Sequence, residues 1–417
     1  MNRWIYCLFL WNLLGFSCFL EELFAVQLGV DTFFSEYADR CLARHQGKKM
    51  RVAIARNQTS MSSKGKKTLQ LFLEDDRFQV KAIFTPEHGF FGKIKAAKKV
   101  GDSSFSSIPI YSLYGKTRRP TPFMLRDLDL IVYDIQSIGV RSYTYETTLF
   151  YIMEEAAKKR IPVVVLDRPN PMGGSLVDGL FLEKELRSFI GYLEIPYCHG
   201  MTIGELARYF NGEYQVGCTL HIASMKGWKR SMDFASTRLF WIAPSPNIPR
   251  KDTPFYYSST GILGELGAFS LGLCQNIPFQ MIAAPWIDGR LLAEKCNAQN
   301  LPGIVFFPLS YKASKGAFKG QQVSGVFLRI TNTKTYQPLK VHFLLLGLLK
   351  SLHPKEFLPI LKKAKNTVFS KALGSKKAQR LLEKKAHPFW SIASLIEKDR
   401  RLFLQKRARY LLPEYGP

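Results

Sequence analysis

Carboxylates, histidines, arginines and amides follow short apolar runs at four places in the chain. Side chains of these types can donate, accept or position protons. A pair of carboxyl groups, one protonated and one ionised, is what glycoside hydrolysis needs. Four such clusters therefore predict a polar site suited to acid–base chemistry. The clusters are Asn57-Gln58-Thr59, Pro86-Glu87-His88-Gly89, Asp134 with Gln136 and Arg141, and Asp167-Arg168-Pro169-Asn170.

Glu87 is the first candidate for the general acid or base. It lies between Pro86 and Gly89, and the glycine would let a ligand approach the backbone closely. A loop carboxylate of this kind also often caps the segment that follows it, which is the alternative interpretation. His88 is a second catalytic candidate that either orients Glu87 or binds a sugar hydroxyl. A purely structural loop histidine is an equally good interpretation.

Asp134 and Asp167 are candidates for the second carboxylate, or for binding sugar hydroxyls, because each ends an apolar run. Asp167 is followed by Arg168, so an ion pair that holds the loop explains this aspartate equally well. The neighbouring polar side chains Asn57, Gln136 and Arg168 are candidates for substrate contacts.

Alternating apolar runs and amphipathic stretches must position these clusters. Continuous apolar runs separated by helices are typical of a parallel sheet covered on both faces, and ligands bind such sheets at the carboxyl ends of the strands. The predicted fold class is therefore α/β. The predicted strands are Met50–Arg56, Phe78–Phe84, Asp129–Ile135, Ile161–Asp167 and Cys218–Ser224, and the predicted helices are 31–46, 147–159 and one from Thr202 to about Tyr209.

The proline-rich segment 241–254 interrupts this periodicity and predicts a domain boundary. Residues 26–240 are expected to form the first domain, and residues 241–417 a smaller α+β domain. The smaller domain contains predicted strands near 303–307 and 323–330, followed by basic amphipathic helices from about residue 339 to the end. A cleft between the two domains is expected.

Residues 1–25 have the outline of a secretory signal or N-terminal anchor. Arg3 precedes the uncharged run Trp4–Leu20, and Glu21 and Glu22 follow it. We expect export to the periplasm or cell envelope with cleavage after Ala25. An uncleaved membrane anchor is the alternative.

The chain lacks the sequence motifs that are typical of several enzyme classes. The chain has no GxGxxG after a strand, no GxxxxGK[ST], no HExxH, no GxSxG and no CxxC. Dinucleotide redox chemistry, P-loop phosphate transfer, zinc proteolysis and nucleophile-elbow hydrolysis are therefore disfavoured. The seven cysteines are scattered and predict neither a disulfide framework nor a zinc site. No metal ion or cofactor is implied.

The chain carries 59 Lys and Arg against 33 Asp and Glu, a formal charge of +26, which favours anionic partners. Residues 351–410 hold 16 of the basic and 4 of the acidic side chains. No zinc-finger, helix-turn-helix or RNA-binding pattern accompanies them, so nucleic acid is the least favoured partner. A solvated helical face is the simplest interpretation, and peripheral association with an anionic envelope polymer or membrane is the functional one.

Seven strings in order along the chain resemble the NamZ (YbbC-like) family of bacterial exo-β-N-acetylmuramidases. The resemblance implies a Rossmann-like N-terminal domain, a smaller C-terminal domain and a site in the cleft between them. It also implies release of terminal N-acetylmuramic acid from peptidoglycan fragments in cell-wall turnover, with these fragments as the partner. The strings are PEHGF (86–90), YSLYG with TRRPTP (111–122), YDIQSIGVRSYTY (133–145), VLDRPNPMGG (165–174), HGMTIGELA (199–207), PSPNIP (244–249) and APWIDG (284–289).

The resemblance also supplies candidate site residues. Arg118, Arg119 and Arg141 stand in family-like loops, and a guanidinium can bind the lactyl carboxylate of the sugar through two parallel hydrogen bonds. At least one of them is expected to do so, with backbone-carbonyl bonding as the alternative for each. Glu265, at a family-like position, is the third candidate for the second carboxylate. Further substrate-binding candidates are Tyr143 for stacking on the sugar ring, and Asn170, His199 and Asn247 for its hydroxyl or acetamido groups.

Two segments depart from the family pattern. Lys93, Lys95 and Lys98 follow the PEHGF string, and Leu271 and Leu273 stand where the family usually has a glutamate and an arginine. If the run 270–275 contributes to the sugar site, the protein is slow, altered in specificity, or a glycan-binding envelope protein that has lost turnover. The exported glycosidase is the leading hypothesis, and the non-catalytic glycan-binding protein is the alternative.

Overall fold

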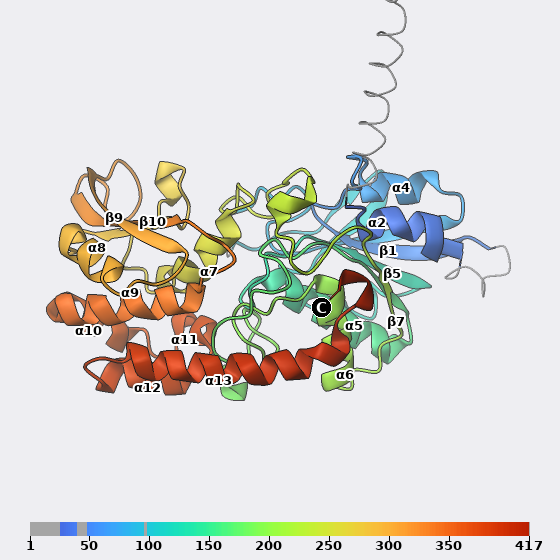
Figure 1. The fold of residues 1–417 in the computed structure, drawn as a ribbon. Coiled ribbons are helices and arrows are strands. Elements are labelled where there is room, and N and C mark those ends of the chain that lie inside the picture. Colours follow the sequence, from blue (N-terminus) through green and yellow to red (C-terminus); the bar gives the residue numbers. More distant parts are fainter. Residues whose placement is uncertain (1–25, 40–47, 96–97, 417) are drawn as a thin grey trace, which may run out of the picture.

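Two β-sheets organise the protein in a computed structural model that describes residues 26–39, 48–95 and 98–416 (Figure 1). The larger sheet has seven strands in the order β3-β4-β2-β1-β5-β6-β7, and all neighbours are parallel except β3 and β4. Its strands are β1 (Met50–Arg56), β2 (Phe78–Thr85), β3 (Ser103–Phe105), β4 (Ile108–Ser112), β5 (Leu130–Asp134), β6 (Val163–Leu166) and β7 (Leu220–Ala223).

The predicted α/β class and the five predicted strands of this sheet are confirmed. The chain runs from β1 outward to β2 and β4, returns to β5 on the other side of β1, and continues to β6 and β7. This reversal is the Rossmann-like pattern. It places the switch in chain direction between the carboxyl ends of β1 and β5, where ligands bind in sheets of this kind.

Different helices cover the two faces of the larger sheet. Successive residues of a strand point to opposite faces, so Ile131 packs in one apolar cluster and Val132 in another. The cluster of Ile131 contains α5 and α6, and the cluster of Val132 contains α2 and α4. These helices are α2 (Gly29–Thr32), α4 (Thr68–Glu74), α5 (Thr144–Lys159) and α6 (Ile203–Glu213).

The two long helices of this domain begin at identifiable signals. At the start of α6, Thr202 accepts a hydrogen bond from the backbone N–H of Glu205, and the Glu205 side chain accepts one from the N–H of Thr202. Helix α5 begins at Thr144, three residues before the predicted start. Glu146 in its first turn complements the positive helix N-terminus, a signal that apolar spacing does not contain.

Two local predictions for the larger domain were incomplete. Within the described residues, the helix predicted at 31–46 begins with α2 and is helical through residue 39, with one π-helical stretch, Phe33–Tyr37; residues 40–47 lie outside the description. The wider turn lets the adjacent rings of Phe33 and Phe34 both pack on Phe72. The edge strand β3 and its neighbour β4 were not predicted. Every residue of β3 is exposed, and β4 is only partly buried, so neither carries the continuous apolar run of the inner strands.

The second domain contains a three-stranded antiparallel sheet in the order β8-β10-β9 and most of the C-terminal helices. Helix α7 begins as the proline-rich segment ends, with Pro254 in its first turn. These elements are β8 (Met281–Ala284), β9 (Ile304–Lys312), β10 (Gln322–Ile330), α7 (Thr253–Gly264), α8 (Gly289–Asn297), α9 (Pro338–Leu352), α10 (Pro354–Lys363), α11 (Val368–Leu373), α12 (Lys376–Lys384) and α13 (Phe389–Arg407).

The last residues of the chain return to the first domain. Figure 1 shows α13 running beneath both parts of the molecule toward α6. Beyond it, the hydroxyl of Tyr415 donates to Asp167 Oδ2 at 2.6 Å, and the ring of Tyr415 packs edge-on against Trp228. Arg407 donates to the backbone carbonyls of Gly174 and His199. The C-terminal segment thus fastens the two domains together.

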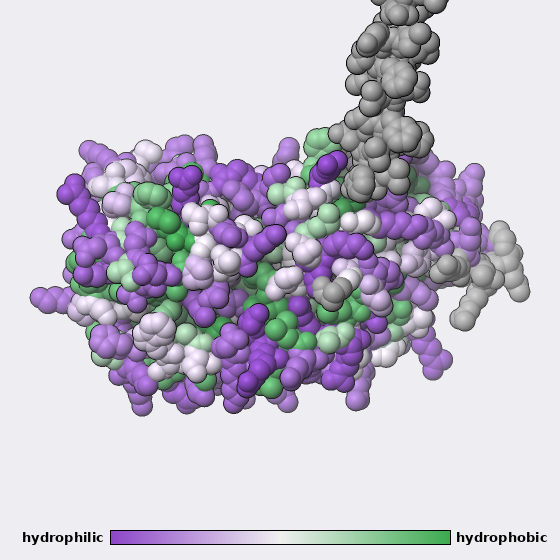
Figure 2. Space-filling view, viewed as in Figure 1, coloured by the Kyte–Doolittle hydropathy of each residue, from purple (hydrophilic) through white to green (hydrophobic). Residues whose placement is uncertain are grey.

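The face shown in Figure 2 is mainly hydrophilic, with apolar side chains gathered in small separate patches. Among the described residues, no helix is long and apolar enough to cross a membrane. The predicted signal or anchor, residues 1–25, lies outside the described residues.

Candidate active site

A polar cavity of about 420 Å³ lies where the two domains meet, and we refer to it as the main cavity. Residues from the carboxyl end of β2, the start of α5, the proline-rich segment, the end of α7, and α11 line it. The lining residues are Glu87, His88, Tyr114, Arg118, Ser142, Tyr143, Thr144, Ser188, Phe189, Ile190, Ser245, Asn247, Ile248, Tyr257, Glu265, Phe279, Val368 and Lys371.

Glu87 is held at the first turn of α5. It follows β2 in a tight turn in which His88 and Gly89 have left-handed backbone conformations, with φ of 68° and 74°. Its carboxylate oxygen Oε2 accepts a hydrogen bond of 2.7 Å from the hydroxyl of Thr144. Because Thr144 is the first residue of α5, the positive end of that helix stabilises negative charge on Glu87.

Glu265 reaches the same cavity from the C-terminal end of α7. Partial burial of its carboxyl group and the negative charge of Glu87 both raise its pKa above the usual value. The negative end of α7 acts in the same direction, because it disfavours a carboxylate. The surroundings of Glu265 therefore favour the protonated carboxyl group, whereas Glu87 lies at a helix N-terminus. A difference of this kind between two carboxyl groups is typical of an acid and its ionised partner in one active site.

Two phenol groups beside the carboxyls keep their protons. Burial, followed by the negative charge of Glu87, raises the pKa of Tyr114 to about 12. Burial likewise raises the pKa of Tyr257 to about 12, with smaller contributions from the charges of Glu265 and Glu87. Both hydroxyls can therefore donate hydrogen bonds to a ligand over the physiological pH range.

His88 presents one defined nitrogen to the cavity. Its Nδ1 lies 2.6 Å from the carbonyl oxygen of Ile94. A carbonyl can only accept, so Nδ1 donates this bond and Nε2 is the nitrogen available to a ligand. This geometry suits contact with a sugar hydroxyl.

Arg118 is a cationic group positioned at the cavity by aromatic rings. Its guanidinium carbon lies 4.3 Å from the ring centroid of Phe189 and 5.4 Å from that of Tyr114. Within the described ranges no carboxylate forms an ion pair with Arg118, so its N–H groups can bind an anionic substrate group. Lys371 from α11 adds a second positive charge to the lining.

Of the three candidates for the second carboxylate, only Glu265 shares a cavity with Glu87. Asp134 is fully buried, pairs with Arg168 and accepts a hydrogen bond from Thr68. Asp167 is also fully buried, and it accepts hydrogen bonds from Thr202, the N–H of Gly204 and Tyr415. Through these contacts the two aspartates stabilise the carboxyl end of the sheet and the start of α6.

The predicted arginines occupy three different environments. Arg118 lines the main cavity, whereas Arg119 forms ion pairs with Glu154 and Glu155 on another surface. Arg141 is buried and donates to the backbone carbonyls of 180, 195, 372 and 373, so it joins the two domains. Arg141 therefore has the alternative role, in which the arginine bonds to backbone carbonyls.

The other residues predicted to contact the substrate also lie in different environments. Tyr143 and Asn247 line the main cavity. His199 is buried against Glu146, with its Nε2 3.1 Å from Glu146 Oε1. Asn170 bonds the backbone of residues 172 and 201 and shapes a turn. Asn57 accepts two hydrogen bonds from Thr59 and caps the turn after β1.

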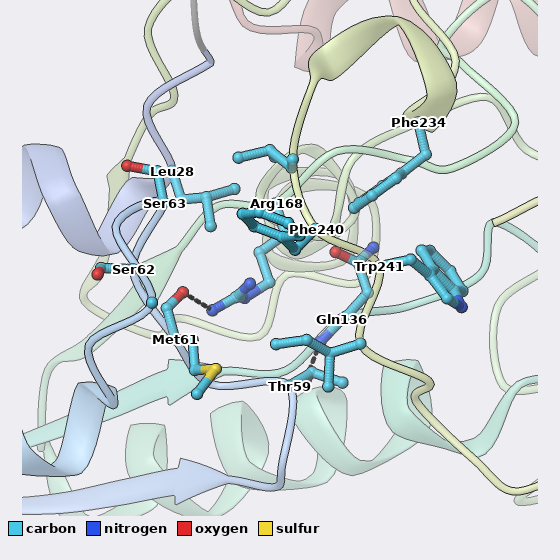
Figure 3. Close-up of a pocket in the computed structure, with 13 residues that line it drawn as sticks. Leu28, Thr59, Met61, Ser62, Ser63, Gln136, Arg168, Phe234, Phe240 and Trp241 are labelled. Carbon is cyan, nitrogen blue, oxygen red and sulfur yellow. Dashed lines mark hydrogen bonds between the residues drawn. The ribbon is translucent and has the colours of Figure 1, made fainter. Parts of the chain in front are cut away.

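Gln136 and Arg168 line a different cavity, which we call the second cavity (Figure 3). The two cavities have no lining residue in common. Neither contains a metal-binding cluster: in the part of the chain that the structure describes, no group of three or more His, Cys, Asp or Glu is arranged to hold a metal ion.

Several residues of the main cavity were not identified from the sequence. Tyr114, Ser142, Thr144 and Ser245 lie in strings that had been noted, but no chemical signal separated them from their neighbours. Phe189 and Lys371 come from segments without a motif. Lys371 enters the cavity only because α11 packs against α7, which the sequence of residues 351–410 alone does not reveal.

The departures from the family pattern lie outside the lining of the main cavity. Leu271 is buried in the core, and Leu273 is exposed at 44 % on a short 3-10 turn. Lys93, Lys95 and Lys98 are exposed. None of these five residues lines the main cavity.

Comparisons with known proteins cover nearly the whole described chain. Residues 52–252 match the family described as exo-beta-N-acetylmuramidase NamZ, N-terminal, and residues 255–412 match its C-terminal counterpart. A protein of Bacillus subtilis (strain 168) named peptidoglycan beta-N-acetylmuramidase NamZ is 38% identical over 334 residues, which is 80% of this chain and 79% of the relative.

Two crystal structures of DUF1343 family proteins from Bacteroides fragilis share the fold. One is 35% identical, with a TM-score of 0.84 over 93% of this chain and 99% of that chain. The other is 23% identical, with a TM-score of 0.67 over 93% of this chain and 98% of that chain.

Proposed function

Because this chain belongs to the exo-β-N-acetylmuramidase NamZ family, we propose that it is a glycosidase that releases terminal β-linked N-acetylmuramic acid from peptidoglycan fragments. The observation that carries the proposal is the placement of Glu87 and Glu265 in one cavity with Arg118. Glycoside hydrolysis needs one protonated and one ionised carboxyl group on either side of the scissile bond.

The surroundings of the two carboxyl groups suggest their roles. Glu265, whose pKa is raised, is suited to protonate the leaving oxygen. Glu87 accepts the Thr144 hydroxyl at a helix N-terminus and is suited to act as the ionised partner. Tyr114 and Tyr257 keep their protons and are suited to donate hydrogen bonds to the sugar.

Arg118 is suited to recognise the lactyl carboxylate that distinguishes the muramic sugar. A guanidinium stacked on Phe189 keeps its edge N–H groups free for two parallel bonds to a carboxylate. Lys371 adds long-range attraction for the same group. His88 Nε2 and Asn247 are suited to the neutral groups of the sugar.

The test of this proposal is release of free N-acetylmuramic acid by the purified full chain. Suitable substrates are a chromogenic β-N-acetylmuraminide and the disaccharide N-acetylmuramic acid–N-acetylglucosamine. Release is expected from the unchanged protein and from Glu294→Gln, a control at an exposed position on α8. Glu87→Gln should abolish release without unfolding, because the amide oxygen can still accept the Thr144 bond.

Absence of release with retained binding of muropeptides would favour the alternative, a glycan-binding protein that has lost turnover. The placement of Leu271 and Leu273 outside the main cavity supports the enzyme over this alternative. Full activity of Glu87→Gln would contradict the role of Glu87.

We also propose export to the cell envelope, with cleavage after Ala25. N-terminal sequencing of the protein isolated from the envelope should begin at Val26. A chain that still begins at Met1 would support the anchor instead.

A basic face supports peripheral association with an anionic envelope polymer or membrane. Ten exposed Lys and Arg side chains lie between residues 355 and 385, across α10–α12, against Glu356 and Glu383. Co-sedimentation with anionic phospholipid vesicles should exceed that with zwitterionic vesicles and should fall as salt is raised, because attraction between exposed charges is screened beyond about 8 Å at physiological ionic strength. Binding that is equal for both vesicles and insensitive to salt would contradict the proposal.

A further inference from the structure

The second cavity lies at the point where sheets of this type bind ligands. It has a volume of about 250 Å³, roughly the liquid volume of eight water molecules. Thr59 after β1, Gln136 after β5 and Arg168 after β6 contribute to it, so it spans the switch between β1 and β5. The carboxyl groups of the main cavity are not part of it.

The floor of the second cavity carries one unused acceptor. Gln136 is buried, and its Nε2 donates to the carbonyls of Ser137 and Pro169 at 2.8 Å each. Because both partners are acceptors, the orientation of the amide is fixed and Oε1 must face the other way. No donor among the described residues bonds this oxygen, and Gln136 lines the cavity together with Phe240 (Figure 3).

One donor lines the same cavity. Arg168 is also buried, its Nε pairs with Asp134, and its Nη2 donates to the carbonyl of Met61 at 2.8 Å. Its Nη1 has no hydrogen-bond partner in the described part of the chain, and Arg168 lines the cavity. An acceptor and a donor that line one cavity can bind the N–H and the C=O of an amide group, which point in opposite directions.

The walls are apolar and partly aromatic. Phe234, Leu239, Phe240 and Trp241 form one side, and Phe240 is 88% exposed at the rim. Aromatic rings of this kind pack against the C–H face of a sugar or against an acetyl methyl group.

The charges beside the cavity offset one another. Arg168 and the neighbouring buried Arg56 are balanced by Asp134 and by Asp31, which accepts hydrogen bonds from the N–H groups of Leu28 and Ser63. An anionic ligand would therefore be buried without a counter-charge of its own, which is unfavourable. A neutral ligand is favoured.

We propose that the second cavity binds a neutral N-acetylated amino sugar, the N-acetylglucosamine type, through its acetamido group. The acetamido N–H donates to Gln136 Oε1, its oxygen accepts from Arg168 Nη1, and the sugar packs against Phe240. The choice of an amino sugar rests on the proposed function, because such sugars are the partners of N-acetylmuramic acid in the substrate. The amide-binding geometry is independent of that function.

The two cavities are connected by one segment. Residues 239–242 line the second cavity, and residues 245, 247 and 248 line the main cavity. Between them, Gln58 Nε2 donates to the carbonyls of Ala243 and Pro244, which pins the segment to the loop after β1. A sugar in the second cavity therefore contacts the segment that also shapes the main cavity.

The experiment is titration of the full chain with free N-acetylglucosamine, followed by saturation-transfer NMR on the sugar protons. The acetamido methyl should be the most strongly saturated group. Glucose, which lacks the acetamido group, and N-acetylmuramic acid, which adds a carboxylate, should give at least about tenfold weaker binding at this site, since the buried polar groups or the added charge are left unpaired.

Two variants test the location. Phe240→Ala removes the rim ring and should weaken binding about fivefold, the size of one aromatic contact. Met61→Trp fills the cavity while leaving the backbone bond to Arg168 intact, and it should abolish binding. Phe123→Ala, a matched control that removes a phenylalanine exposed at 63%, should change nothing.

Binding that survives both Phe240→Ala and Met61→Trp would overturn the proposal, as would equal binding of glucose or no binding at all. The measurement follows a free monosaccharide without turnover. Its outcome is therefore separate from that of the hydrolysis test, which monitors Glu87.

Discussion

Thr144 ties Glu87 to the N-terminal end of α5 through a 2.7 Å hydrogen bond. Glu265 faces the same cavity from the C-terminal end of α7. A helix favours negative charge at its start and disfavours it at its end. The fold thus places the two carboxyl groups of one cavity at opposite ends of two helices.

The first prediction separates the roles of the two glutamates. Glu265→Gln should slow cleavage of the disaccharide by about 10²–10⁴-fold, the usual contribution of general acid catalysis. It should slow cleavage of the chromogenic substrate much less, because a nitrophenolate-type leaving group needs no proton. Glu87→Gln should lose activity on both substrates. Rates on the two substrates for each variant are the measurement.

The opposite result, in which Glu87→Gln spares the chromogenic substrate and Glu265→Gln does not, would exchange the two roles. Equal losses for both substrates in both variants would argue against acid assistance by either residue.

The second prediction concerns the protonation of Glu265. An acid catalyst works only while it holds its proton, so activity on the disaccharide should fall as the pH rises through the raised pKa of Glu265. Part of this shift comes from the charge of Glu87. The Glu265 carboxyl should therefore titrate at lower pH in Glu87→Gln, as followed by carbon NMR of labelled glutamate. An unchanged midpoint would show that the two groups do not interact.

The third prediction compares two adjacent arginines. Arg118→Ala should raise the KM for the muramic substrate by about 10- to 100-fold, which corresponds to loss of one charge-assisted contact. Arg119→Ala is the matched control, since Arg119 is paired with Glu154 and Glu155 away from the cavity, and its KM should stay the same. Steady-state kinetics distinguish them, and a similar effect of both changes would remove Arg118 from the recognition of the carboxylate.

The sequence was sufficient for the framework that positions Glu87. Buried parallel strands carry uninterrupted apolar residues, so β1, β2, β5, β6 and β7 could be located from the sequence. Locating these strands also identified the residues that come directly after each of them. The sequence could not distinguish a strand-end carboxylate in a cavity from one that holds the fold. Asp134 and Asp167 lie at strand ends, as Glu87 does after β2. However, both aspartates are buried, and they bond to Arg168 and Tyr415 instead of facing the main cavity.

The position of Lys371 and the bonding partners of Arg141 could not be predicted for a different reason. Both depend on where α11 packs: Lys371 of α11 lines the main cavity, and Arg141 donates to α11 carbonyls more than two hundred residues away in the chain. Nothing local encodes such a contact. Glu265 was found only because its position resembled the family, and not from its neighbours in the sequence.

The last prediction concerns Asp167 and the C-terminal segment. Burial raises the pKa of Asp167 to about 7, while in the unfolded chain it is about 3.9. Between these values the folded state binds more protons than the unfolded state, so this contribution to stability is complete below about pH 4 and is lost as the pH rises through about 7. Tyr415 opposes the shift, because its hydroxyl bonds to the ionised carboxylate.

Asp167→Asn should therefore flatten the fall in the free energy of unfolding between pH 5 and pH 8, measured by urea denaturation. Tyr415→Phe should have the opposite effect. Without the phenol bond the pKa of Asp167 rises further, so the loss of stability becomes larger and extends to higher pH. A pH dependence in Asp167→Asn identical to that of the unchanged protein would show that another group titrates in this range.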